Sequence, residues 1–464
     1  MTSNRLFDRA GAVLLAILVV LTALVEWGVP GFGALRGLVA IGVIVTLGLA
    51  VRLSRKAFVA VGLALTLWSV LVDPQWLDVV GRGAASAGFI GAFFGALATL
   101  RNVAQTSPAI GDAGRYLASQ PPGRRYVALC SGGHLFALLL SYGAISLLGS
   151  LATQAASSEP DPEIRFHRTR RMLLAIQRGF ISSLAWSPLG FAMAITTVLI
   201  PGGSWNAAVL PGLGSMAILF GLGWAMDSIF KPRLAAPAPR RPVEGSVRRL
   251  SPLLLLLFLL TLFAGGLHVL TGIRIVGVVL VVVPLLSIGW AVIQARGGGL
   301  GLGERGKAFL FGDLPGYRGE IVLLMMAGYI GTLGAPLLAP IMAGLGVDLG
   351  ALPTWLLLLG LIWLIPILGQ LGMNPILAVT LIAPMIPAPE MLGITPTALI
   401  TAIVAGWTIS GICSPFTATT LLVGAFGNVS ALHVGLRWNG SYVAVAGGLL
   451  SLWVLLYAFV LGVP

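Results

Sequence analysis

Long apolar runs recur along this chain of 464 residues, from about position 10 almost to its end. Several are about 20 residues long, the length at which a helix crosses the hydrocarbon core of a bilayer. The chain is 57% hydrophobic and 9% charged, and its mean hydropathy is +0.99. These values exclude a water-soluble fold. We expect an all-α integral membrane protein with about 11 transmembrane helices.

The N-terminal run begins near Ala10 and has no small-residue cleavage site after it, so we expect a retained helix rather than a signal peptide. The two cysteines, Cys130 and Cys413, both lie in apolar segments. A disulfide framework is therefore not expected.

Basic residues are strongly biased toward alternate loops. Of the 28 Lys and Arg residues, all but Arg36, Arg82 and Arg274 fall on one side of the expected topology. By the positive-inside rule the N-terminus should lie in the cytoplasm and the C-terminus outside, in a multi-pass protein of the cytoplasmic (inner) membrane. Because the basic residues are scattered with little aromatic interleaving, no nucleic-acid partner is expected.

One pattern occurs twice, as GFISSLAWSP at Gly179–Pro188 and as GWTISGICSP at Gly406–Pro415. The copies share a glycine, an aromatic residue, two serines four residues apart and a proline after the second serine. In a helix the serines share one face. Proline removes a backbone donor and clashes with the preceding turn, so each copy predicts a helix broken inside the membrane.

We expect these broken helices at about 171–200 and 395–427. Backbone groups at such breaks are tolerated only where protein or a polar cavity satisfies them. A matched pair of breaks, one in each half of a chain, indicates the binding site of a transporter.

A re-entrant hairpin is expected before each broken helix. The first covers about 124–152 with its tip at Ser131–His134, and the second covers about 351–389 with its tip around Gly372–Pro375. Each interrupts an apolar segment whose two ends face the same side by the charge bias.

The expected organisation has four parts: an extra N-terminal helix (1–30), a first repeat (31–230), a Pro-rich basic cytoplasmic linker (231–250) and a second repeat (251–464). An odd number of crossings separates the halves, so the repeats should be inverted in the membrane.

This layout resembles the ion transporter superfamily, and most closely the divalent anion/sodium symporters. That resemblance implies two inverted repeats, re-entrant hairpins, broken helices and a dimeric scaffold. The hairpin tips here read Ser131–Gly132–Gly133–His134 and Gly372–Met373–Asn374–Pro375 in place of the family's Ser-Asn-Thr signature. The membrane subunits of tripartite periplasmic uptake systems are similar in architecture.

The candidate binding residues lie at the four interruptions. They are Ser131, Gly132, Gly133, His134, Ser183, Ser187, Pro188, Gly372, Asn374, Pro375, Ser410, Ser414, Pro415 and Thr417. Of these, Ser183, Ser187, Asn374, Ser410 and Ser414 are candidate ligands for Na⁺. Hydroxyls inside a membrane also satisfy helix backbone or allow close helix packing, which is the alternative for each residue taken singly.

Two charged or titratable side chains stand out in this region. His134 is expected near mid-membrane, either donating to an anion or coupling a proton, or else bonded to backbone as a neutral structural residue. Arg178 lies in the first broken helix, where it either extends back to the interface or attracts the substrate. No acidic residue is expected at mid-membrane, which argues against carboxylate-based cation exchange.

The sequence therefore predicts a secondary active transporter of a small anionic, carboxylate-type solute, working by an elevator motion and driven by Na⁺ or H⁺. We expect a homodimer in the lipid bilayer with no resident cofactor, no metal cluster, no ATPase motif and no enzymatic activity. Two alternatives are the membrane subunit of a multi-component uptake system and an intramembrane enzyme using His134 or Cys130.

Overall fold

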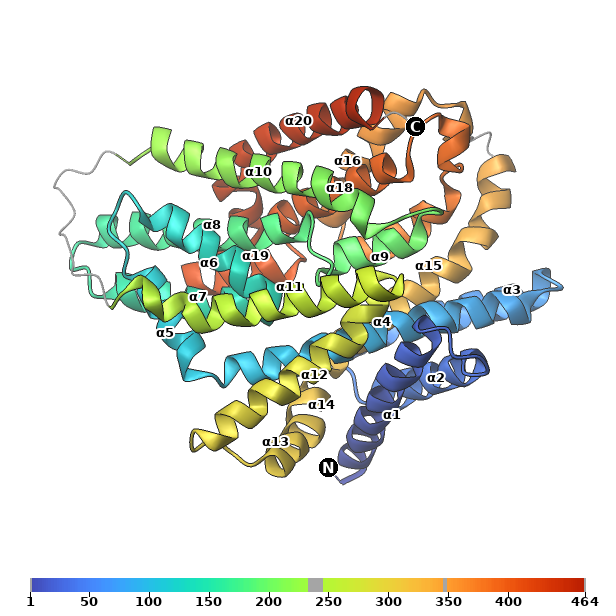
Figure 1. Ribbon diagram of the computed structural model, residues 1–464. Coiled ribbons are helices and arrows are strands. Elements are labelled where there is room, and N and C mark those ends of the chain that lie inside the picture. The colour runs from blue at the N-terminus through green and yellow to red at the C-terminus, as the bar shows by residue number, and fades with distance from the viewer. Residues whose placement is uncertain (1, 233–244, 345–348, 463–464) are drawn as a thin grey trace. The chain divides into compact units, whose positions relative to one another are not determined.

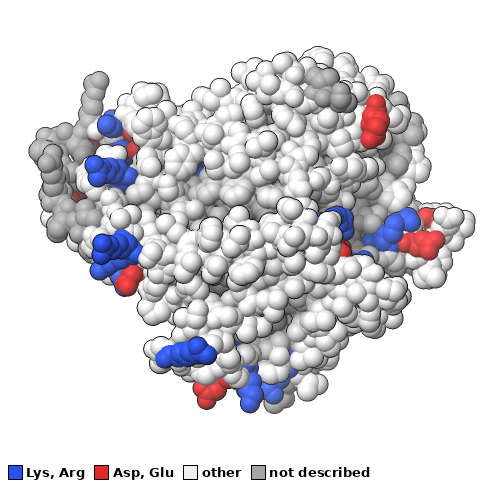
Figure 2. Space-filling model, in the orientation of Figure 1, with Lys and Arg blue, Asp and Glu red and all other residues white. Residues whose placement is uncertain are grey.

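The computed structural model describes residues 2–232, 245–344 and 349–462. Within these ranges all regular elements are helical, and nine helices are long and apolar enough to cross a membrane. Most of the surface visible in Figure 2 carries neither acidic nor basic side chains. The predicted all-α membrane class is thus confirmed.

The chain forms two compact units, each assembled from separate segments. Unit 1 comprises residues 1–103, 260–351 and 376–387, and unit 2 comprises residues 104–259, 352–375 and 388–464. These units do not follow the expected halves 31–230 and 251–464, because each takes helices from both. The inverted relation of the two repeats stays a prediction.

Unit 1 holds α1 (Thr2–Glu26), α2 (Gly33–Leu49), α3 (Leu53–Val72), most of α4 (Trp76–Gln105), α12 (Ile275–Arg296), α13 (Leu302–Ala308), α14 (Leu314–Gly316), α15 (Arg318–Gly344) and most of α17 (Pro375–Ile382). It also holds the short π-helical segment η2 (Phe309–Asp313) and the 3₁₀ turns η3 (Leu349–Ala351) and η4 (Ala383–Met385). The helix α11 (Ser251–Thr271) contributes to both units.

Polar contacts between distant segments hold unit 1 together. The Arg274 guanidinium lies 2.7 Å from the Glu26 carboxylate, and the Arg318 guanidinium lies 2.8 Å from the Asp8 carboxylate. The Thr380 hydroxyl donates to the Ala327 carbonyl at 3.0 Å, which links α17 to α15.

Unit 2 holds α5 (Pro108–Ala118), α6 (Arg125–Leu140), α7 (Gly143–Ser157), α8 (Pro162–Leu184), α9 (Phe191–Leu199), α10 (Trp205–Ile229), α16 (Thr354–Gln370), α18 (Pro396–Cys413), α19 (Ala418–Gly427) and α20 (Gly440–Leu456) (Figure 1). Its shorter elements are η1 (Val247–Leu250), η5 (Pro389–Leu392), η6 (His433–Trp438) and η7 (Tyr457–Leu461). The central part of the expected linker, 233–244, lies outside the described residues.

Both broken helices form where the repeated pattern predicts them. The first is α8 and α9, interrupted at residues 185–190 around Ser187–Pro188. The second is α18 and α19, interrupted at residues 414–417 around Ser414–Pro415. The buried faces of α8 and α18 also lie in contact, since a Cβ on Gly411 would lie 2.6 Å from the Ile181 side chain.

The glycine that opens each copy of the pattern sits against a backbone carbonyl of another helix. A Cβ on Gly179 of α8 would lie 2.0 Å from the Cys130 oxygen of α6, and a Cβ on Gly406 of α18 would lie 2.6 Å from the Leu361 oxygen of α16. The contact between α6 and α8 also involves a glycine of α6, because a Cβ on Gly133 would lie 2.4 Å from the Ile176 oxygen of α8. Small residues thus let each broken helix pack backbone to backbone on a helix earlier in the chain, α8 on α6 and α18 on α16.

The first hairpin exists, but its expected tip is wrong. Residues Ser131–His134 lie inside α6, and the chain reverses at Ser141–Tyr142, where Ser141 adopts a positive φ of 49°. Gly132 and Gly133 are buried in helix contacts rather than used to break the chain. A Gly-Gly pair predicts a turn only when no neighbouring helix requires close approach.

The second hairpin turns where expected, between α16 and α17, with Gly372 at a positive φ of 93°. Its two arms differ from the expectation, however, because α16 belongs to unit 2 and most of α17 to unit 1. Segment 351–389 is therefore divided between the two units.

We predict that Gly179→Ala destabilises the protein by at least about 2 kcal/mol, because the new methyl group meets backbone that no side-chain rotation can move. Gly221→Ala in α10 is the matched control, since nothing lies within 4 Å of its Cβ position. Thermal unfolding of both purified variants in detergent measures the difference. Equal midpoints for the two variants would contradict the backbone contact.

Candidate functional site

At the first break, backbone hydrogen bonds and the side chain of one serine stabilise the turn. The Ser187 amide donates to the Ser183 carbonyl at 3.0 Å, and the Ser187 Oγ accepts from the Leu189 amide at 3.2 Å. The second break repeats the latter bond, because the Ser414 Oγ accepts from the Phe416 amide at 3.3 Å. In both copies, therefore, the serine before the proline shapes the turn that the proline starts.

His134 lies beside the first break in a chain of hydrogen bonds. Its Nδ1 lies 2.8 Å from the Ser182 Oγ, and its Nε2 accepts from the Trp186 indole at 3.2 Å. An indole only donates, so Nε2 is the acceptor and the proton is assigned to Nδ1. Ser182 in turn donates to the Gly179 carbonyl at 2.7 Å.

These bonds satisfy both nitrogens of a neutral imidazole. The His134 and Trp186 rings also stack, with centroids 5.9 Å apart and planes 13° apart. The Trp186 carbonyl accepts from the Trp205 indole at 2.8 Å, which ties α10 to the break. Of the roles considered for His134, the arrangement fits the structural one best, and the residue orients Trp186 and Ser182.

At the second break, side chains cap the exposed carbonyls of α18. The Gln177 and Gln370 amides donate to the Ile412 and Cys413 carbonyls at 3.4 and 3.0 Å. Two threonine hydroxyls donate to the carbonyls on either side: the Thr419 hydroxyl to the Gly411 carbonyl, and the Thr420 hydroxyl to the Ser414 carbonyl at 2.6 Å. The end of α18 is thus capped by protein groups, as a helix end inside a membrane requires.

The first break is less completely capped. Among the described residues, no side-chain donor reaches the carbonyl oxygens of Ile181, Ser182 or Leu184. The Ser183 hydroxyl instead donates to the Phe180 carbonyl of its own helix at 2.7 Å. Of the two breaks, the first therefore leaves more backbone oxygen for a bound species or water.

Arg178 is buried, so of the two alternatives for this residue the extension to the interface is not observed. Only 6% of its surface is exposed. Its Nε donates to the Asn439 Oδ1 at 3.2 Å, and its guanidinium lies 4.1 Å from the centroid of the Tyr442 ring. Asn439 also donates to the Gln177 Oε1 at 2.9 Å, so one polar network joins α8 to the start of α20.

No carboxylate of the described residues lies within ion-pair distance of Arg178. Its partners are an amide oxygen and an aromatic face, which carry no formal charge. A buried guanidinium without a carboxylate partner is rare and often marks a functional position.

The remaining candidates divide by position. Ser410, Ser414 and Thr417 gather at the second break, where the Ser414 Oγ donates to the Gly369 carbonyl at 2.6 Å. Ser131 is half-buried in α6, away from any turn. Gly372 is exposed and Asn374 half-buried at the turn after α16, with Pro375 opening α17. Pro188 and Pro415 are half-buried within the breaks.

Sequence reasoning missed four side chains of this region: Gln177, Gln370, Asn439 and Trp186. The signal for three of them was an amide side chain at or near an apolar run, a placement that usually marks a buried polar contact. In the described ranges, no group of three or more His, Cys, Asp or Glu side chains is arranged to hold a metal ion. The Na⁺ assignment stays a prediction.

Two solved structures have a fold similar to that of this chain. No family model and no curated protein sequence matches the chain. The crystal structure of the YdaH transporter of Alcanivorax borkumensis aligns with 87% of this chain and 98% of its own, with a TM-score of 0.61 and 17% identity. MtrF of Neisseria gonorrhoeae, from a class of antimetabolite efflux pumps, aligns with 89% and 96%, with a TM-score of 0.51 and 14% identity.

The chain therefore has a fold that membrane transporters use. Both similarities cover nearly the whole length of the known chains, so they concern the complete architecture rather than one helical pair. The narrower resemblance to divalent anion/sodium symporters is not established by them and stays a prediction.

We predict that Ser414→Ala destabilises the protein by about 1–2 kcal/mol, because the Gly369 carbonyl and the Phe416 amide lose their partner. Ser410→Ala is the matched control one helical turn away. The Ser410 Oγ is fully buried and makes no hydrogen bond with the described residues, so its removal should leave stability unchanged or raise it. Thermal unfolding without ligand compares the two. Equal destabilisation by both substitutions would contradict this assignment.

Proposed function

We propose that this protein is a secondary active transporter of a small anionic solute. The observation that carries the proposal is Arg178, a guanidinium buried in unit 2 without a carboxylate partner among the described residues. An intramembrane charge of this kind is costly and usually functional. A bound anion would supply the missing negative charge each time the site is occupied.

The chemistry of the surroundings favours a carboxylate-type solute. Guanidinium presents a planar fork of N–H donors that matches a carboxylate, and Nε alone is used by Asn439. The neighbouring Tyr442 ring and the Asn439 and Gln177 amides are fully buried, and in such surroundings a charge-assisted hydrogen bond is strong.

The proposed mechanism is alternating access by an elevator motion. Unit 2 contains the first hairpin, α16 and both broken helices, whereas most of α4, all of α15 and most of α17 belong to unit 1. Apart from α17, this grouping is the one expected if the substrate-carrying elements move as a body against a scaffold. We propose Na⁺ or H⁺ as the coupling ion and a homodimer as the working form.

We predict that Arg178→Gln weakens anion binding while the folded protein remains. Loss of a charge-assisted hydrogen bond should weaken binding about ten- to a hundredfold. Removing an unpaired buried charge should not lower the thermal midpoint in the absence of ligand. A thermal-shift screen of sulfate and of mono-, di- and tricarboxylates, in sodium and in potassium, measures both quantities.

The control for that screen is Arg165→Gln, an exposed arginine in the same helix. It should keep the ligand-induced shift of the wild type. An anion that stabilises Arg178→Gln as strongly as the wild type would exclude Arg178 from the site.

Transport itself is tested in proteoliposomes. We predict concentrative uptake of the anion that gives the largest thermal shift, dependent on an inward sodium or proton gradient and strongly reduced with Arg178→Gln. Concentrative uptake that persists at full rate without either gradient would contradict ion coupling. The complete absence of both uptake and counterflow for all stabilising anions would contradict the transporter proposal.

A further inference from the structure

A cleft away from both helix breaks opens between α6, the N-terminal part of α8 and α10. Its volume is about 230 Å³, and all of its lining residues belong to unit 2. One part of the lining is apolar, including Leu129, Met172 and Trp224. The other part is charged, and by the positive-inside rule this end of α10 is expected in the cytoplasm.

The charged part of the lining is predominantly basic. It has four basic side chains, Arg125, Arg168, Arg171 and Lys231, and one carboxylate, Asp227. Arg171 binds that carboxylate with two nitrogens, at 2.7 and 2.6 Å. A positive excess therefore remains in the cleft, and a concave basic surface concentrates anions.

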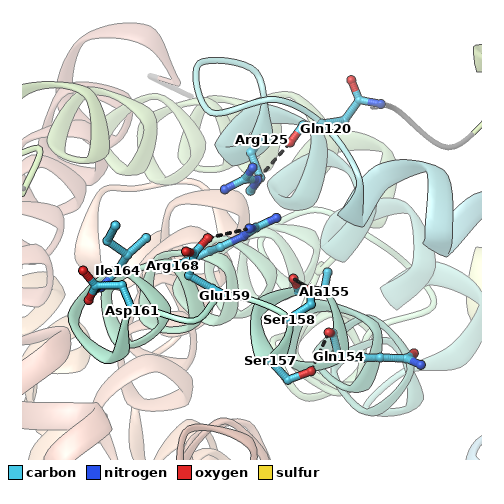
Figure 3. Close-up of polar contacts among 10 residues, drawn as sticks. All are labelled: Gln120, Arg125, Gln154, Ala155, Ser157, Ser158, Glu159, Asp161, Ile164 and Arg168. Carbon is cyan, nitrogen blue, oxygen red and sulfur yellow. Dashed lines mark hydrogen bonds and ion pairs between the residues drawn. The ribbon is translucent and has the colours of Figure 1, made fainter. Parts of the chain in front are cut away.

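Neighbouring contacts hold two of these arginines in place (Figure 3). The Arg168 guanidinium lies 3.8 Å from the buried Glu159 carboxylate, and the Arg125 Nε donates to the Gln120 carbonyl at 2.9 Å. Even with Glu159 included, basic groups outnumber acidic ones around the cleft. Ordered guanidinium groups lose less entropy on binding an anion than free ones would.

An exposed apolar stripe on α10 leads to the cleft. The stripe consists of three exposed residues that are spaced by seven positions and share one helix face: Leu210, Ala217 and Trp224. Leu210 is 74% exposed, Trp224 is 50% exposed, and Phe230 after the helix is 72% exposed. Because α10 is long and apolar enough to cross the bilayer, this face is suited to contact lipid chains.

We propose that the cleft binds the head group of an anionic phospholipid. The phosphate would lie among the basic side chains, and an acyl chain would follow the stripe from Trp224 toward Leu210. Two features favour a lipid over a free anion: Trp224 belongs both to the cleft lining and to the apolar stripe, and the charged and apolar parts adjoin at the end of one transmembrane helix. The site does not involve Arg178 and does not depend on the transport proposal.

The test compares two lipids on the purified full-length protein. Native mass spectrometry and thermal shifts, each with phosphatidylglycerol and with phosphatidylcholine, give the preference for the anionic head group. We expect wild type to prefer phosphatidylglycerol, and Arg125→Gln/Lys231→Gln to lose about tenfold of that preference. Trp224→Ala should weaken both lipids alike, because it removes the apolar wall and no charge.

The control variant removes two charges elsewhere in unit 2. Arg115→Gln/Arg165→Gln alters exposed arginines that do not line the cleft, and it should bind like wild type. If the cleft double variant fails to fold, the exposed Lys231→Gln alone serves as the test with a smaller expected loss.

Two results would overturn the proposal. One is an unchanged preference for phosphatidylglycerol in the cleft variants, or an equal loss in the control. The other is stabilisation by inorganic phosphate or glycerol 3-phosphate that equals the lipid effect and competes with it, which would assign the cleft to a soluble anion.

Discussion

The architecture of unit 2 depends on two contacts in which a glycine lets helix backbones touch. Gly179 sits on the Cys130 carbonyl and Gly406 on the Leu361 carbonyl, at equivalent positions of the repeated pattern. In a membrane no hydrophobic force drives helices together, so close packing of small residues is a main source of association. Each contact fixes a broken helix on its neighbour, and the break follows eight or nine residues later.

Once the broken helices are fixed, the polar groups at the breaks must be satisfied. At the second break, side chains of the protein satisfy the carbonyls at the end of α18, which accept hydrogen bonds from Gln177, Gln370 and two threonines. The first leaves backbone oxygens without side-chain donors among the described residues, close to His134 and Trp186. Two copies of one pattern thus produce unequal sites. Arg178, which has no counterpart in the second copy, instead joins the network of Asn439 and Gln177, and Gln177 reaches the Ile412 carbonyl at the second break.

The sequence predicted the membrane class, both breaks and most helix positions, because apolar length and Ser-Pro interruptions are local properties. It failed at Ser131–His134, where a Gly-Gly pair was interpreted as a turn although the glycines serve contact with α8. It did not predict which helices bury Arg178, since contacts with α10 and α20 are a property of packing. The partners Gln177 and Asn439 are 262 positions apart, a pairing that no single-segment pattern contains.

Arg178 is the proposed anion-recognition residue. The most direct measurement is an experimental structure determined with the anion that stabilises the protein most. We predict density for that anion within hydrogen-bond distance of the Arg178 guanidinium. Bound anion density elsewhere in unit 2, with Arg178 still held only by Asn439 and Tyr442, would contradict the central claim.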